Sequence, residues 1–303
     1  MKRKQLNLLL VAVTALLVLA IVLSGEEEVI APSLTSLDSE AITHIEVRHR
    51  DSDPIRLDKG AHGWALTAPV RIAADELQVN ALTALAYRET SGEYLAAEVD
   101  LVKLGLSPPQ WAIQLNDTEL LFGNKEPVQD RRYVQVGDKV WLASDPPSTA
   151  LDADYSDLVH AKLMPEGTAA ISAIETPHFQ LQQENEVQWQ VTPAKASQGP
   201  DARAKLLAHW ENARSLWRNR FDPATDKPIK GDFIRVSFGD QLVEYQVIER
   251  DPQLKLLRKD LDVVYTLAPK YGVDLFELQK PPQDPTVGEA GVKAPAADAD
   301  SSD

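Results

Sequence analysis

The chain has 303 residues, of which 44% are hydrophobic and 25% are charged, as in an ordinary globular protein. Its 46 acidic residues outnumber 31 basic ones, and the formal net charge of -15 argues against a nucleic-acid partner, because phosphates are held chiefly by Lys and Arg. The lack of cysteine excludes disulfides, thiolate metal sites and a catalytic thiol.

The N-terminus has the pattern of a membrane anchor. Basic residues at positions 2–4 precede an apolar run from Leu8 to Leu23. Because basic residues stay on the cytoplasmic side, we expect one span, with the N-terminus in the cytoplasm and the bulk of the chain in the periplasm. A cleaved signal peptide is the alternative, since the run has only 16 residues. The sequence therefore predicts an inner-membrane protein with a stub and signal anchor over 1–28 and a linker over 29–41.

Residues 42–165 predict the first of two similar α+β units. Strand-like runs cover Ile42 to His49 and Trp64 to Thr67, and Asp75 can cap a following helix. Alternating apolar residues from Trp111 to Leu115 then begin a meander. The further strands expected in this meander are Glu119 to Phe122, Tyr133 to Val136 and Val140 to Ala143. The predicted order is β-β-α-β-β-β-β, with mainly antiparallel pairing.

Residues 166–280 predict a second unit in the same order. Trp64 recurs as Trp189, 125 residues later, and Leu115 recurs as Phe238, 123 residues later. Such small drift in the offset is what loop insertions and deletions produce, so the pattern indicates an internal duplication. A tail rich in Ala, Pro and Asp follows over 281–303, and we expect it to be disordered because it offers little apolar surface to bury.

The motifs of the first unit resemble a known family, the bacterial domain of unknown function numbered 4340. They are Gly63-Trp64, Gly105-Leu106-Ser107-Pro108-Pro109, Leu121-Phe122-Gly123, Tyr133-Val134, Val140-Trp141-Leu142 and Tyr155-Ser156-Asp157-Leu158. The resemblance covers the first unit well and the second only in outline. It implies a membrane-anchored accessory of gliding-motility-type ABC transporters, with an ABC transporter permease as a partner. It carries over no catalytic residue, because its motifs are structural.

Signals for catalysis are missing from the sequence. Nucleophile elbows, phosphate-binding loops and dinucleotide fingerprints do not occur. His44, His49, Asp51 and Asp53 lie close in sequence, but their spacing is not that of a zinc site, so solvated polar residues are the better interpretation. We therefore predict no catalytic residue, no cofactor and no metal, and a protein that is not an enzyme.

One cluster suggests a binding surface. Trp210 and Trp217 fall on a predicted helix stripe with Leu206 and Ala213, which favours core packing. The arginines beside them can anchor a partner or simply flank an exposed helix face. The possible partner-binding residues are Arg203, Arg214, Arg218 and Arg220. The predicted function is an accessory or scaffold protein of an ABC-type transporter or envelope assembly. The alternative is a periplasmic binding module for a glycan or peptide in a cleft between the two repeats.

Overall fold

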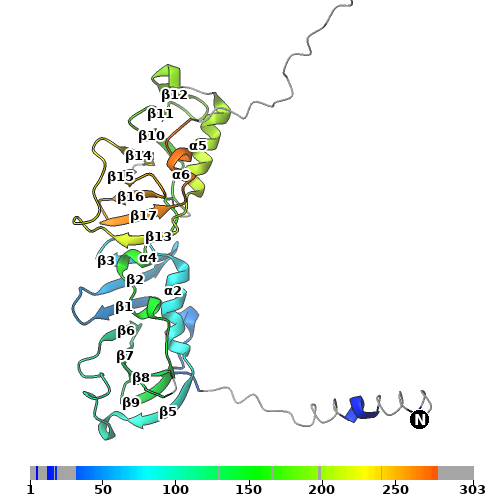
Figure 1. Cartoon of the computed structure of the whole chain (residues 1–303), viewed down its shortest axis with the longest axis vertical. Helices are drawn as coiled ribbons and strands as arrows, with labels where there is room; N and C mark the ends of the chain where they lie inside the picture. The colour runs from blue at the N-terminus through cyan, green and yellow to red at the C-terminus, as the bar shows by residue number, and fades with distance from the viewer. Residues whose placement is uncertain are drawn as a thin grey trace, which may run out of the picture. The chain divides into compact units, whose positions relative to one another are not determined.

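The chain folds into two compact units, each built on one antiparallel β-sheet (Figure 1). They divide between Ala153 and Asp154. The structure, a computed structural model, describes residues 5, 12–16, 18, 32–128, 130–164, 167–196, 199–239 and 241–278.

The first unit contains a nine-stranded sheet in the order β4-β3-β2-β1-β6-β7-β8-β9-β5. Its strands are β1 (His44–His49), β2 (Ile55–Gly60), β3 (Gly63–Ala68), β4 (Ile72–Ala73), β5 (Thr90–Leu95), β6 (Trp111–Leu115), β7 (Thr118–Lys125), β8 (Arg131–Val136) and β9 (Lys139–Ser144). Its helices are α2 (Glu76–Thr83) and α3 (Ser148–Leu151), with short 3-10 turns η1 (Ser39–Ala41), η2 (Ala84–Tyr87) and η3 (Ala96–Glu98).

The second unit contains an eight-stranded sheet in the order β12-β11-β10-β14-β15-β16-β17-β13. Its strands are β10 (Ile171–Glu175), β11 (Gln180–Gln183), β12 (Trp189–Thr192), β13 (Trp217–Arg220), β14 (Phe233–Phe238), β15 (Gln241–Glu249), β16 (Leu254–Arg258) and β17 (Val263–Leu267). Its helices are α4 (Tyr155–Leu158), α5 (Pro200–Asn212) and α6 (Tyr271–Asp274), with one 3-10 turn, η4 (Ala194–Ala196).

The two sheets have the same strand order. When the two-residue β4 is set aside, the series from β3 to β5 in the first unit corresponds one to one with the series from β12 to β13 in the second. The main helix of each unit, α2 or α5, comes after the opening strands and before the edge strand that pairs with the last strand of the meander. The repetition in the sequence is therefore accompanied by a repetition of topology.

The predicted fold class needs correction. The units are not α+β bodies of β-β-α-β-β-β-β order, because the described chain is mostly two antiparallel β-sheets with few and short helices. The prediction missed β2 because turn residues precede it, although Ile55 and Leu57 are buried alternately with exposed neighbours. It also missed the edge strands β5 and β13, whose sequences are polar and show no apolar alternation.

The predicted membrane anchor is overturned as well. Over the part of the chain that the structure describes, none of the helices combines the length and the apolar character that a bilayer span requires. This finding corrects the single-pass inner-membrane localisation and the membrane partner that the N-terminal pattern predicted. Most of the expected segment, including its ends Leu8 and Leu23, lies outside the described residues, as does the predicted tail at 281–303.

Helix α2 lies against one face of the first sheet (Figure 1). It begins where the sequence predicts, because the Asp75 side chain accepts a hydrogen bond from the Leu77 amide at 3.1 Å. Val79 and Leu82 are buried, whereas Leu77 is 70% exposed. The cap therefore fixed the start of the helix, while sheet packing decided its orientation.

Helix α5 ends before the predicted helical stripe does, since that stripe extends to Trp217. Leu206 and Trp210 are buried in the core as expected, but the helix ends at Asn212. Trp217 lies instead in strand β13 and is 47% exposed. The helical spacing of Trp217 in the sequence is thus a coincidence, because the chain has already turned into the edge strand.

Candidate functional site

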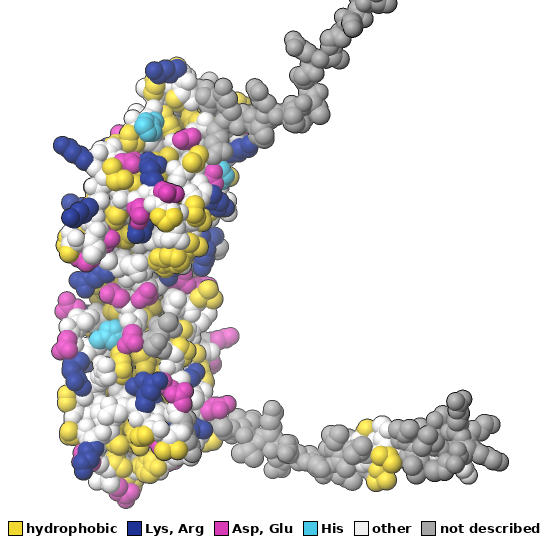
Figure 2. Space-filling view, in the orientation of Figure 1, with side chains coloured by type: hydrophobic (Ala, Val, Ile, Leu, Met, Phe, Trp, Pro, Cys, Tyr) yellow, Lys and Arg dark blue, Asp and Glu magenta, His cyan; other side chains and the backbone are white. Residues whose placement is uncertain are grey.

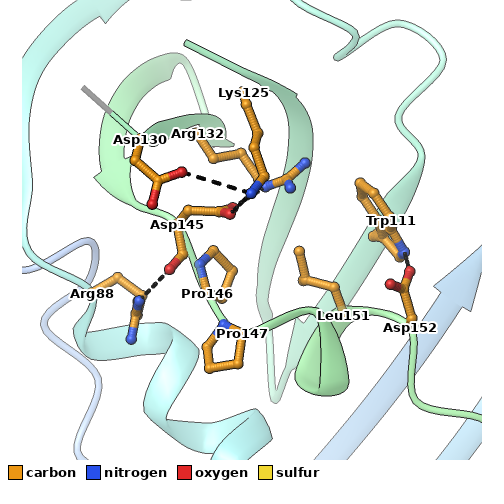
Figure 3. A pocket seen from close by; sticks show the side chains of 10 residues that line it. All are labelled: Arg88, Trp111, Lys125, Asp130, Arg132, Asp145, Pro146, Pro147, Leu151 and Asp152. Carbon is orange, nitrogen blue, oxygen red and sulfur yellow. Dashed lines mark hydrogen bonds and ion pairs between the residues drawn. The ribbon is translucent and has the colours of Figure 1, made fainter. Parts of the chain in front are cut away.

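Two adjoining cavities lie at one end of the first sheet, where β7 and β9 end and β6 and β8 begin. The larger has a volume of about 360 Å³ and the smaller about 280 Å³. The larger is lined by three cations (Arg88, Lys125, Arg132), three carboxylates (Asp130, Asp145, Asp152) and the apolar side chains of Trp111, Pro146, Pro147 and Leu151 (Figure 3). The smaller is lined by His49, Arg50, Asp51, Ser52, Gln110, Trp111 and Asp152.

Trp111 and Asp152 form a wall that both cavities share. The indole Nε1 donates a hydrogen bond to Asp152 Oδ1 at 3.0 Å (Figure 3). The guanidinium carbon of Arg132 lies 4.9 Å from the centroid of the Trp111 ring, which is within the range of a cation–π contact. The ring is therefore held in one orientation before any ligand arrives.

Arg132 is a charged residue on a core-facing position of β8 and is only 7% exposed. Its Nε donates to Asp145 Oδ1 at 2.6 Å, and its Nη1 donates to the Gly123 carbonyl at 2.6 Å. Lys125 also forms an ion pair with Asp145. Together these contacts compensate for the removal of the guanidinium from water.

The pKa of Asp145 is lowered by its surroundings. Burial by itself raises the pKa of this carboxyl, but hydrogen bonds from Lys125 and Arg132 stabilise the carboxylate and outweigh burial. The hydrogen bond between Lys125 and Asp145 also raises the pKa of the Lys125 ammonium. Asp145 is therefore ionised at neutral pH, and it neutralises part of the positive charge in the larger cavity.

Arg88 holds the segment after β9 that lines the larger cavity. Its Nε donates to the Ser144 carbonyl at 3.2 Å. Its Nη2 donates to the Asp145 carbonyl at 2.6 Å (Figure 3). These bonds fix the chain just after β9, from which Asp145 and the following two prolines line the cavity. This part of the cavity wall is thus held by the Arg88 side chain, which comes from the segment between η2 and β5.

Two glycines let a loop approach the sheet beneath this site. A Cβ on Gly123 would lie 2.3 Å from the Leu104 carbonyl oxygen, a separation that no side chain can adopt. Gly105 has a φ of +73°, and the Leu104 carbonyl accepts a hydrogen bond from the Asn124 amide at 2.8 Å. The two glycine motifs therefore make one packed junction, from which the Gly123 carbonyl reaches Arg132.

A comparison with protein families matches residues 64–223, just over half of the chain, to the family described as Domain of unknown function (DUF4340). The chain belongs to the DUF4340 family. No curated protein and no solved structure matches the chain. The DUF4340 match includes every residue that lines the larger cavity, so that cavity lies within the family domain.

The histidines and carboxylates considered in the sequence are only partly brought together in this DUF4340 protein: His49 and Asp51 both line the smaller cavity, whereas His44 contacts Asp58. His44 Nδ1 lies 2.7 Å from Asp58 Oδ1, while His49 Nε2 lies 2.8 Å from the Leu151 carbonyl oxygen. Among the described residues, no three His, Cys, Asp or Glu side chains are grouped so that they could hold a metal ion.

The four arginines predicted as a partner-binding set are spread over α5, β13 and the segment between them in the second unit. Arg203 is on α5, with its guanidinium carbon 5.9 Å from the Trp189 ring centroid. Arg218 is only 8% exposed on β13 and donates to the Asp157 carbonyl at 2.6 Å. Arg220, also on β13, lies over Tyr155, and the exposed Arg214 precedes that strand. Their role in partner binding stays a prediction, and Arg218 has a structural contact within its own unit.

Sequence reasoning missed the site at Trp111. It treated Trp111 only as the first apolar residue of an alternating strand. A signal was present in β8, where Arg132 takes a position that alternation assigns to the core side, two residues before the buried Val134. A cation at such a position needs buried partners, and those partners are the cavity residues.

Proposed function

We propose that this DUF4340 protein is a non-enzymatic accessory protein that acts by binding, and that its ligand is a glycan or a peptide lying across Trp111. The observation that carries the proposal is the wall of Trp111 and Asp152 shared by two adjoining cavities. A ligand that fills both cavities contacts this shared wall. We propose this site, within the first unit, in place of a cleft between the repeats.

The chemistry of the site supports binding. The walls of the larger cavity combine six charged side chains with the Trp111 ring and three further apolar side chains, so a ligand finds both hydrogen-bonding groups and an apolar surface. The hydrogen bond to Asp152 and the cation–π contact with Arg132 hold the ring in place. Such preorganisation reduces the entropy lost on binding.

An accessory role in a larger assembly is the second part of the proposal. A doubled domain can hold a bound segment with one unit and leave the surface of the other for a second contact. The link to an ABC-type transporter is supported by the family resemblance alone, and the site itself does not select an assembly.

Titration of the full chain with two ligand panels tests the binding function. One panel contains oligosaccharides and the other contains blocked tetrapeptides, and calorimetry measures binding up to millimolar concentrations. We expect a ligand from one panel to bind, and Trp111→Ala to weaken it at least tenfold. The matched control is Trp141→Phe, because Trp141 lies on β9 of the same unit and lines neither cavity. Binding by neither panel, or equal binding by both variants, contradicts the proposal.

A further inference from the structure

We infer that the ligand of the Trp111 site is an uncharged oligosaccharide, with two consecutive sugar rings in the two cavities. This inference rests on the proposed binding function and assigns its ligand class. It is carried by three observations: the balance of charge in the larger cavity, the shared aromatic wall, and the position of the site at the end of the sheet.

The charges in the larger cavity are balanced in number, and two of its three cations form ion pairs with its carboxylates. Three cations face three carboxylates, and Asp145 is bound by both Lys125 and Arg132. An anionic ligand would compete with Asp145 for these cations and leave a nearly buried carboxylate without its partners, which is costly. On the face shown in Figure 2, basic and acidic side chains are likewise interspersed rather than gathered by sign. The site offers no net charge to select an ion.

Hydroxyl groups suit such a site because each one both donates and accepts hydrogen bonds. They can bind a carboxylate on one side and a guanidinium on the other without breaking an ion pair. Asp152 uses Oδ1 to accept from the indole, and its other oxygen can accept from a ligand hydroxyl. In the smaller cavity, Ser52 and Gln110 add uncharged hydrogen-bonding groups.

The shared wall suits a sugar ring in shape and polarity. The face of an indole ring is electron-rich and attracts the weakly positive C–H groups of an apolar ligand face. A pyranose has such a C–H face with hydroxyls around its edge. Because Trp111 and Asp152 border both cavities, two consecutive rings of one chain can occupy the pair and share this wall.

A peptide fits the same place less well. Extended peptides commonly bind by adding a strand to a sheet edge, where their backbone groups find partners. The edges of the first sheet are β4 and β5, whereas the cavities lie at the ends of the inner strands β6, β7 and β8 and of β9. A peptide there would need side-chain partners for each backbone amide.

The experiment is calorimetric titration of the full chain with cellotetraose, maltotetraose and chitotetraose as uncharged probes. Tetragalacturonate is the anionic probe, and blocked tetrapeptides represent the other ligand class. We expect at least one uncharged sugar to bind, with a Kd that changes less than twofold between 50 and 500 mM NaCl, because no ion pair is formed. Saturation-transfer NMR should show contact with two adjacent rings.

Variants assign the binding to the site. We expect Trp111→Ala to weaken the sugar at least tenfold and Trp111→Phe to weaken it less, while Trp141→Phe leaves it unchanged. Circular dichroism and the melting temperature show that each variant is folded. Trp111-dependent binding of peptides alone, or of tetragalacturonate alone, overturns the sugar assignment but leaves the binding function standing. Binding of no probe overturns both.

Discussion

Asp145 is the residue on which the charge arrangement of the site depends. It is nearly buried between Lys125 and Arg132, and it faces a guanidinium that also lies over Trp111. Breaking a buried ion pair from one side costs more than the pair contributes, because the remaining charge stays buried without compensation. The stability of the first unit and the orientation of the indole are therefore coupled through one carboxylate.

We expect Asp145→Asn to reduce the free energy of unfolding of the first unit by about 3 kcal/mol at pH 7. The folded pKa of Asp145 is lowered, so its stabilisation is fully present above the unfolded pKa of about 4 and is lost as pH falls through the folded value. The difference in the free energy of unfolding between the variant and the original chain should thus be constant from pH 5 to 7. It should become smaller below pH 4. Urea denaturation at each pH measures it.

Asp130→Asn is the control for this measurement. Asp130 also contacts Lys125, at 3.7 Å, but its side chain is 87% exposed. An exposed pair contributes little, so we expect the control to change stability by less than about 0.5 kcal/mol. An equal loss of the free energy of unfolding in both variants would mean that the burial of Asp145 does not explain its contribution to stability.

At the scale of elements, the junction between Gly105 and Gly123 explains two sequence motifs that contain no catalytic or ligand-binding side chain. Gly105-Leu106 and Leu121-Phe122-Gly123 are distant in sequence, yet the loop before Leu106 packs directly on β7. The Gly123 carbonyl then accepts from Arg132, which links the junction to the cavity. A motif recognised only as structural thus also positions the site.

We expect Gly123→Ala to reduce the free energy of unfolding by about 2 kcal/mol or more, because the new methyl group would overlap the Leu104 carbonyl oxygen. The substitution should also weaken ligand binding, because a shift of the backbone at position 123 moves the carbonyl that accepts the hydrogen bond from Arg132. Gly60→Ala is the control: Gly60 ends β2, and its nearest contact would be the Gly63 carbonyl oxygen at 3.9 Å. Urea midpoints compare the two, and similar losses would contradict the steric explanation.

The elements also show what the sequence could predict. The inner strands of both meanders were predicted because one face is buried, so apolar residues alternate along them, as in Phe233–Phe238. The edge strands β5 and β13 carry polar residues and are defined by pairing with a distant strand, which a local pattern does not record. The Trp111 site was missed for a related reason. Its residues come from strand ends and loops far apart in the chain, and only the sheet register brings them together.

At the scale of the whole molecule, the two units share a topology but not a core chemistry. The second unit buries Tyr245 and Tyr265 in a cluster with Trp210, with ring centroids 5.8 and 6.2 Å apart. In the first unit, Tyr87 and Tyr94 are exposed, and its core is made mainly of aliphatic side chains. The two units thus have the same strand order but differ in the side chains that fill their interiors.

This difference predicts that the second unit unfolds first at alkaline pH. Burial raises the pKa of Tyr245 to about 12, and burial also raises that of Tyr265. An unfolded tyrosine loses its proton near pH 10, so between pH 10 and 12 the unfolded state binds fewer protons and stability falls as pH rises. Subtilisin digestion at pH 8 and pH 11, followed by mass spectrometry, should show cleavage of the second unit first at pH 11.

Tyr245→Phe separates this titration from other alkaline effects. The variant loses the hydrogen bond from the Tyr245 hydroxyl to the Leu163 carbonyl, at 3.2 Å, and should be about 1 kcal/mol less stable at pH 8. Since one buried hydroxyl no longer titrates, the further loss between pH 8 and 11 should be smaller than in the original chain. Tyr94→Phe, on the exposed β5, should change neither value. If the first unit were cleaved first at pH 11, the buried tyrosines would not be what limits alkaline stability, and the units would differ for another reason.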